Sequence, residues 1–108
     1  MNSENIIQNI RKSGALLDGH FLLTSGRHSD KYFEKFSLLS QPKIVEELCD
    51  SIARFFMDEN VDIVVGAATG GIVLAYEVGK KLDISGIFSE RVDGIMTFKR
   101  GFSLSKGQ

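Results

Sequence analysis

The chain has 108 residues, of which 43% are hydrophobic and 25% are charged, and its formal net charge is −1. This length allows at most one domain with a packed core. The balanced charge argues against sequence-independent nucleic-acid binding, so we expect no nucleic-acid partner. The apolar runs are too short to cross a bilayer and no apolar leader opens the chain, so we expect a cytoplasmic protein without a membrane partner.

The first 40 residues predict a short helix followed by a small β-rich flap. Three isoleucines within the first ten residues share one helical face, and Gly14 is the kind of residue that commonly ends a helix. Residues 15–39 then form short β-rich pieces with turn signals at Asp18-Gly19 and Ser25-Gly26. We therefore expect an antiparallel flap in this part of the chain.

A longer helix is predicted next. Pro42 stands in its first turn, where proline is well tolerated. Six apolar residues follow the helical period and are expected to face a core: Ile44, Val45, Leu48, Ile52, Phe55 and Phe56. Cys49 falls on the same side, where we favour a small buried hydrophobe over a reactive thiol.

The next segment predicts a β-α-β unit. The run "VDIVV" at 61–65 is apolar without alternation, which is typical of a parallel strand covered on both faces. A helix from about Gly71 to Leu82 and a second strand, "ISGIFSE", follow, and the remainder predicts a long hairpin-like loop. Parallel sheets usually have about five strands. Because only two are clear, we expect either a working fragment or a domain that continues past Gln108.

The glycine-rich turn at 66–71 is the clearest candidate binding element. It is not a dinucleotide fingerprint, because Ala68 stands where the second glycine is required. It is not a P-loop either, because Ile72 and Val73 replace the lysine and the hydroxyl residue. Two interpretations remain: an anion site at a helix N-terminus, and a plain strand-to-helix turn whose glycines allow close packing.

Four stretches in order resemble the orotate phosphoribosyltransferases, a branch of the type I phosphoribosyltransferases. They are "GHFLLTSGRHSDKYFEKF" (19–36), "DIVVGAATGGIVLAYEVG" (62–79), "IFSERVDG" (87–94) and "MTFKRGFSLSKGQ" (96–108). The resemblance implies an α/β fold, with a parallel sheet flanked by helices and a small N-terminal β-rich hood. Residues 1–40 would form the N-terminal helix and hood, and 41–108 the first part of the core, including a mobile catalytic loop at about 90–106.

The resemblance also implies which residues bind orotate. They are Thr24, Ser25, Gly26, Lys31, Tyr32 and Phe33. Ser25 and Gly26 would shape the hood turn, and the two aromatic rings would lie against the flat base. The alternative is an ordinary strand with one aromatic buried and the other exposed. Lys31 would be a cation for a carboxylate or phosphate, or alternatively part of a solvated face.

The other implied site residues concern pyrophosphate. The loop that would hold it contains Ala67, Ala68, Thr69, Gly70 and Gly71, and in this fold class such a loop often has a non-proline cis peptide. The catalytic cations would be Arg91, Lys99 and Arg100, which could stabilise departing pyrophosphate. The alternative for this basic segment is a solvated surface hairpin. Magnesium would enter with the substrate, and no protein metal site is expected, since His20 and His28 have no partners at ligand spacing.

The implied function is transfer of phosphoribose from 5-phosphoribosyl 1-pyrophosphate to orotate, which yields orotidine 5′-phosphate for UMP biosynthesis. A homodimer is expected from the family. Two departures stand out: many members have lysine where Thr24 and Gly70 stand, and the ribose-phosphate loop is not in this chain. We therefore expect a chain truncated before that loop. The alternatives are a catalytically incomplete phosphoribosyl-pyrophosphate-binding module and a purine phosphoribosyltransferase.

Overall fold

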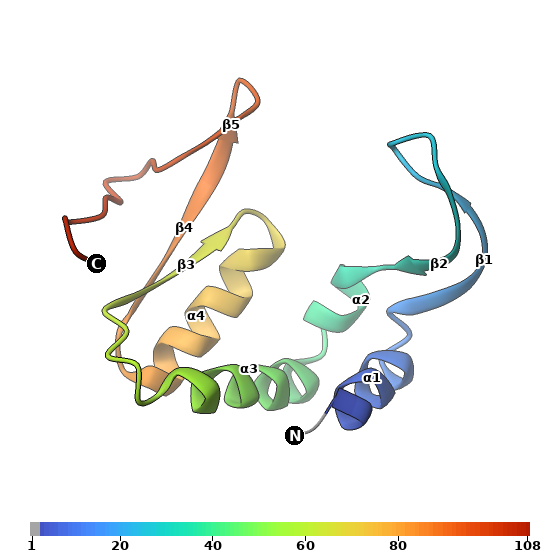
Figure 1. Cartoon of the computed structure of the whole chain (residues 1–108), viewed down its shortest axis with the longest axis horizontal. Coiled ribbons are helices and arrows are strands. Elements are labelled where there is room, and N and C mark those ends of the chain that lie inside the picture. The colour runs from blue at the N-terminus through green and yellow to red at the C-terminus, as the bar shows by residue number, and fades with distance from the viewer. Residues whose placement is uncertain (1–2) are drawn as a thin grey trace. The chain divides into compact units, whose positions relative to one another are not determined.

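Residues 3–108 are described by the computed structural model and fall into two units, divided between Ile44 and Val45 (Figure 1). Unit 1 contains α1 (Ser3–Lys12), β1 (Leu16–Leu22), β2 (His28–Phe33) and α2 (Lys35–Leu39). Helix α3 (Pro42–Phe56) begins just before the boundary. Unit 2 continues with β3 (Ile63–Ala67), α4 (Gly70–Leu82), β4 (Ser85–Val92) and β5 (Ile95–Thr97).

Unit 1 is built around an antiparallel hairpin, as the sequence predicts. The register of β1 and β2 runs from Leu16 opposite Phe33 to Leu22 opposite His28. The glycine of the Asp18-Gly19 pair does not form a turn; it lies within β1, where the register shifts between Asp18 and Phe21. An isolated glycine inside a strand often marks such an irregularity. Only the second predicted turn signal therefore reverses the chain.

The prediction of β-rich structure up to residue 39 is wrong after Phe33. Residues 35–39 form the short helix α2. Its start is capped by Glu34, whose carboxylate accepts a hydrogen bond from the Phe36 N–H at 3.2 Å. This local side-chain bond satisfies a backbone donor that no residue within the helix can reach.

Unit 2 contains the predicted β-α-β unit. β3 and β4 pair in parallel from Ile63 opposite Ser85 to Ala67 opposite Ser89, and α4 connects them. The hairpin-like continuation is also present, because β5 pairs antiparallel with β4 across an Asp93-Gly94 turn in which both residues have positive φ. That combination is the type I′ turn, which matches the twist of a two-residue hairpin.

The predicted burial of β3 on both faces is wrong. Gly66 faces α4, since a Cβ built there would lie 3.1 Å from the Ala75 Cβ. Successive strand residues point to opposite faces, and the neighbouring Val65 is 44% exposed. The lack of alternation in "VDIVV" therefore reflects a strand that is apolar on both faces. Within residues 3–108, the face toward α4 is better covered than the opposite face.

Helix α3 buries only part of the predicted set: Val45 is buried, Ile44 and Leu48 are half-buried, and Ile52, Phe55 and Phe56 are exposed. Its buried residues are Val45, Cys49 and Ala53, four apart and mostly small, whereas Phe55 is 78% exposed. Small residues along one stripe allow neighbouring elements to approach closely, and an Asp50–Lys81 ion pair at 3.9 Å links α3 to α4. The predicted burial of Cys49 is confirmed. Burial, followed by the nearby Glu77 charge, raises the pKa of its thiol.

Across residues 3–108, none of the helices combines the length and the apolar character needed to traverse a lipid bilayer.

Candidate functional site

The tip of the unit 1 hairpin is formed by the predicted hood residues Thr24, Ser25 and Gly26. The Gly26 N–H donates to the Leu23 carbonyl oxygen at 2.9 Å, and the Leu23 N–H donates to the Arg27 carbonyl oxygen at 2.8 Å. Gly26 has φ +87°, which completes a three-residue hairpin loop of the common glycine-bulge type. All three residues are exposed, so their polar groups are accessible to a ligand.

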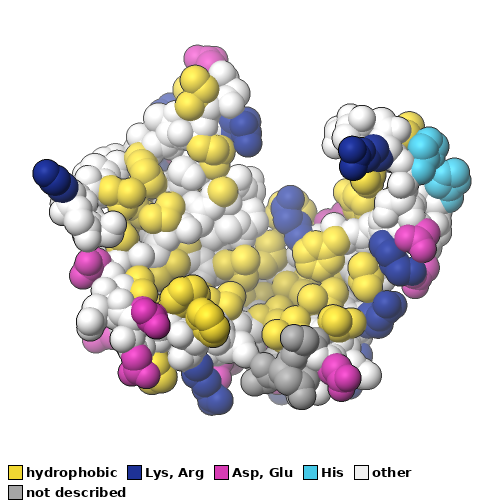
Figure 2. Space-filling model, in the orientation of Figure 1, with side chains coloured by type: hydrophobic (Ala, Val, Ile, Leu, Met, Phe, Trp, Pro, Cys, Tyr) yellow, Lys and Arg dark blue, Asp and Glu magenta, His cyan; other side chains and the backbone are white. Residues whose placement is uncertain are grey.

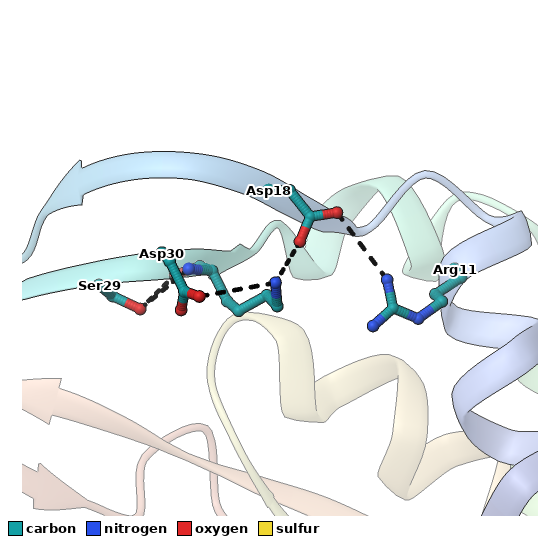
Figure 3. Close-up of polar contacts among 5 residues, drawn as sticks. Arg11, Asp18, Ser29 and Asp30 are labelled. Carbon is teal, nitrogen blue, oxygen red and sulfur yellow. Dashed lines mark hydrogen bonds and ion pairs between the residues drawn. The ribbon is translucent and has the colours of Figure 1, made fainter.

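Lys31 lies in a small charge cluster with Asp18, Asp30 and Arg11, the three charged residues that are labelled in Figure 3. It stands directly opposite Asp18 in the strand register, and its ammonium donates a hydrogen bond to the Asp18 carboxylate. Arg11 lies 3.9 Å from the other Asp18 oxygen, and Asp30 lies 3.8 Å from the Lys31 Nζ. The Lys31 hydrogen bond lowers the pKa of Asp18, and the Asp18 partner raises the pKa of Lys31. A bound anion would therefore compete with Asp18 for this ammonium.

The predicted aromatic pair is exposed on both members, because Tyr32 is 43% and Phe33 is 49% exposed. The alternative of one buried and one exposed ring does not hold. Adjacent strand residues point to opposite faces, so only one of the two rings can lie against a given flat ligand. The Tyr32 ring is held by a tilted contact with Phe21, at 5.5 Å between centroids.

Two histidines that are distant in sequence meet on the hairpin. Nε2 of His20 and Nδ1 of His28 lie 2.7 Å apart, and Figure 2 shows the two imidazoles side by side at the surface. Spacing along the sequence does not reveal this contact, because it depends on strand register. No cluster of three or more His, Cys, Asp or Glu ligands is found within residues 3–108.

The glycine turn of unit 2 shows why bare backbone is needed there. A Cβ on Gly66 would lie 2.0 Å from the Gly71 carbonyl oxygen, and one on Gly71 would lie 3.1 Å from the Gly66 carbonyl carbon. The end of β3 and the start of α4 are thus packed backbone to backbone. This observation supports the close-packing interpretation, and it leaves the anion-binding interpretation open because both can operate in one loop.

The polar groups of this loop are suited to an anion. The Ala68–Thr69 peptide bond is cis, as the family resemblance implies. Thr69 precedes α4, and its hydroxyl makes no capping bond to the helix. The first N–H groups of a helix have no partner within it, and the helix dipole favours negative charge at that end. The Ala68 N–H is engaged elsewhere, since it donates to the Ser89 carbonyl oxygen on β4 at 2.8 Å.

Two of the three predicted catalytic cations are engaged with their own loop. Arg91 donates from Nη1 to the Gly94 carbonyl oxygen at 2.9 Å across the β4–β5 turn. Arg100 makes two hydrogen bonds to the Glu90 carboxylate, at 2.9 and 3.2 Å. Lys99 lies close enough for its charge to contribute to lowering the pKa of Glu90.

Unit 2 brings the glycine turn and the basic segment into one connected structure. Gly66 pairs with Phe88 in the parallel register, and the guanidinium carbon of Arg100 lies 6.0 Å from the centroid of the Phe88 ring. Sequence reasoning missed the two carboxylates that hold the proposed cations, Asp18 and Glu90. A signal existed for Glu90, which stands in the "SER" segment of a basic stretch, but its partner ten residues later depends on how the chain folds back.

The chain was compared with known proteins. No family model matches it. The orotate phosphoribosyltransferase of Caldicellulosiruptor saccharolyticus is 44% identical over 108 residues, which is 100% of this chain and 56% of the relative. This chain therefore spans little more than half the length of the curated relatives it matches.

Solved structures give the same picture. The orotate phosphoribosyltransferase of Aeropyrum pernix has a TM-score of 0.62 at 23% identity, covering 85% of this chain and 55% of that one. The Francisella tularensis orotate phosphoribosyltransferase has a TM-score of 0.60 at 26% identity, covering 86% of this chain and 49% of that one. The predicted α/β fold class is confirmed. The predicted resemblance to orotate phosphoribosyltransferases is likewise confirmed along the entire chain, which corresponds to somewhat more than half of such a protein.

Proposed function

We propose that this chain is part of an orotate phosphoribosyltransferase. The proposal rests on the 44% sequence identity to a relative that bears this name, in an alignment that covers all 108 residues of the chain. In the proposed reaction, N1 of orotate forms a bond to the anomeric carbon of 5-phosphoribosyl 1-pyrophosphate. The bond from that carbon to the pyrophosphate oxygen breaks, pyrophosphate leaves with the electron pair, and the N1 proton is lost.

In unit 2, the proposal assigns pyrophosphate to the glycine turn. The Thr69 hydroxyl, which makes no capping bond to the helix, and the first N–H groups of α4 supply donors for phosphate oxygens. The basic segment after β4 supplies positive charge where negative charge develops on the leaving group. No nucleophilic side chain is required, because positioning and charge stabilisation can supply the rate enhancement.

In unit 1, the proposal assigns orotate to the hairpin. Lys31 offers an ammonium for the orotate carboxylate, in exchange with Asp18. We assign the stacking role to Tyr32, because its contact with Phe21 already fixes the ring and so reduces the entropy lost on binding. Phe33 points to the opposite face of the strand.

Magnesium, a homodimer and a cytoplasmic location complete the proposal as expectations from the family. Mg²⁺ commonly binds through substrate phosphates and a few oxygen ligands. We assign it to the substrate and to no residue of this chain. The purine phosphoribosyltransferase and the inactive binding module are not favoured by the names of the relatives.

The test is an assay of the full natural protein that contains this chain, with orotate, 5-phosphoribosyl 1-pyrophosphate and magnesium. We expect orotidine 5′-phosphate and pyrophosphate in equal amounts. Consumption of hypoxanthine or guanine instead of orotate would favour the purine alternative. Binding of the pyrophosphate substrate without turnover of any base would favour the binding module.

A matched pair of variants tests the assignment of the ring. Tyr32→Leu should weaken orotate binding roughly tenfold or more, in keeping with the loss of one base-stacking contact. Phe33→Leu should change it less than about threefold. Equal losses in both variants, measured by orotate titration, would contradict the assignment to a single face of the strand.

A further inference from the structure

The Glu90–Arg100 ion pair closes the segment after β5 onto β4. Arg100 donates from Nε to one carboxylate oxygen at 2.9 Å and from Nη2 to the other at 3.2 Å. This is the two-bond geometry that gives arginine–carboxylate pairs their strength and direction. The Glu90 side chain is 25% exposed and that of Arg100 is 64% exposed, so the guanidinium can be reached from solvent.

Aromatic contacts reinforce the same closure. The rings of Phe88 and Phe102 meet edge to face with centroids 5.1 Å apart, and Arg100 lies between them in sequence and over the Phe88 ring. Arg100 and Gly101 both have positive φ, so the chain turns sharply here. Two residues of β4, one on each side of Ser89, therefore hold the residues at 100–102.

This closure is attached to the glycine turn by backbone contacts. Ser89 accepts the hydrogen bond from the Ala68 N–H at 2.8 Å. Phe88 and Ser89 are also the register partners of Gly66 and Ala67. The residues that hold Arg100 are thus immediate neighbours of the backbone that supports the proposed pyrophosphate loop.

We infer that Glu90 competes with the phosphate groups of pyrophosphate for Arg100. Its carboxylate accepts hydrogen bonds from the guanidinium nitrogens that an anionic ligand would otherwise bind. The inference rests on the proposed function, because it assumes that pyrophosphate binds at the glycine turn. Carboxylate and phosphate groups use the same guanidinium fork. In the free protein Glu90 holds residues 98–102 against β4. When pyrophosphate binds Arg100 in place of Glu90, this segment is released from β4.

The charges of Glu90 and Arg100 favour an exchange of partners, in which pyrophosphate replaces Glu90 on Arg100, over binding of pyrophosphate to the intact ion pair. While paired, Glu90 and Arg100 together have no net charge and attract a polyanion weakly. When Arg100 turns to the anion, a cation is gained at the site and the partly exposed Glu90 carboxylate is left to water, so the ion pair that is given up is worth little. Glu90 is therefore a positioning residue, which determines when Arg100 is available.

The test measures the affinity of inorganic pyrophosphate, at fixed magnesium, for the full natural protein by calorimetry. Glu90→Gln should bind pyrophosphate roughly two- to fivefold more tightly, within the range of an exposed ion pair. In an Arg100→Gln background the same substitution should have no effect, because the competitor then has nothing to hold. Asp93→Asn is the control: it removes one negative charge from the same hairpin, at a positive-φ position that asparagine tolerates.

Equal gains in Glu90→Gln and Asp93→Asn, or a gain that persists in the Arg100→Gln background, would mean a general charge effect and would overturn the inference. A second readout needs no ligand. The Phe102 N–H donates to the Lys99 carbonyl oxygen at 3.0 Å. Its rate of exchange with solvent should increase in Glu90→Gln and should stay the same in Asp93→Asn. Failure of the unmodified protein to bind pyrophosphate would contradict the proposed function, and unchanged exchange in Glu90→Gln would contradict the closure itself.

Discussion

The hairpin of unit 1 and the β3–α4–β4 layer of unit 2 both contain proposed substrate-binding residues, but they hold them differently. In the hairpin, the proposed substrate-binding groups are exposed side chains, positioned by polar pairs across two strands. In the layer, the proposed substrate-binding groups are backbone groups, positioned by direct contact between the end of a strand and the start of a helix. Side-chain changes should therefore affect binding in the hairpin, whereas a single added carbon should affect folding in the layer.

The two ion pairs show the same contrast. Lys31 and Asp18 are register partners on β2 and β1, next to the irregularity between Asp18 and Phe21, so their bond adds to a structure that backbone pairing already defines. Arg100 comes from irregular chain after β5, and its bond to Glu90 holds a segment that no strand pairing holds. The first pair therefore joins two paired strands, whereas the second joins β4 to a segment outside the strands.

The largest effect is expected from Gly66→Ala. The new Cβ would lie 2.0 Å from the Gly71 carbonyl oxygen, and backbone cannot move aside cheaply. We expect a loss of about 3 kcal/mol or more in the free energy of unfolding, at or above the upper end for overpacking. The control is Gly26→Ala at the hairpin tip, where there is open space but φ is +87°, which should cost about 1–2 kcal/mol. Urea denaturation of both variants measures the difference, and similar losses would contradict the contrast between the regions.

A second comparison removes side chains in place of adding one. Ile87 on β4 is 7% exposed, and Ile87→Ala should cost about 2–4 kcal/mol of stability through lost burial and a cavity. Leu22 on β1 is 71% exposed, and Leu22→Ala should change stability by less than about 0.5 kcal/mol. A large loss for Leu22→Ala in calorimetric melting would contradict the exposure of this side chain on the hairpin.

The smallest effect is expected from Asp18→Asn, read through pH. Asp18 has a lowered pKa, so its contribution to stability is present above the unfolded value of about 3.9 and is lost as pH falls through the folded pKa. Lys31 has a raised pKa, so its contribution is present below about 10.4 and is lost as pH rises through the folded pKa. Amide exchange in β1 and β2, once corrected for its intrinsic dependence on pH, should thus accelerate at both extremes in the unmodified protein.

In Asp18→Asn that acceleration should be weaker at both extremes, because the pair is already absent. Asp30→Asn is the matched control, since Asp30 lies 3.8 Å from Lys31 without a hydrogen bond between them. Identical pH profiles for Asp18→Asn and the unmodified protein would show that the ion pair does not contribute to the hairpin.

The elements that are determined by local sequence could be predicted. The helix at Pro42, the glycine-ended first helix and the Ser25-Gly26 turn each follow from short-range backbone preferences. The β-α-β unit follows from an apolar strand, a glycine turn and an apolar helix in order. Helix α2 was missed because its cap is a glutamate, which is not a typical capping residue.

Contacts that depend on register or on chain reversal could not be predicted. The bulge between Asp18 and Phe21 changes which side chains face each other, so the Asp18–Lys31 and His20–His28 contacts do not follow from spacing. The Glu90–Arg100 bond depends on the chain reversal between β4 and β5, which places Thr97 opposite Glu90. The burial of α3 was mispredicted because helical period alone does not indicate which of several apolar faces, with large or small side chains, packs inward.

Cys49 provides the molecule with an internal reporter. Its side chain is fully buried on α3 and its thiol pKa is raised, so an aqueous disulfide reagent cannot reach the sulfur and no thiolate is available to attack the reagent. Labelling therefore requires α3 to separate from its neighbours. These 108 residues contain a single cysteine, so the rate of labelling at Cys49 reports how often one helix opens, and a slower rate with substrate would show that ligand binding is transmitted into the scaffold.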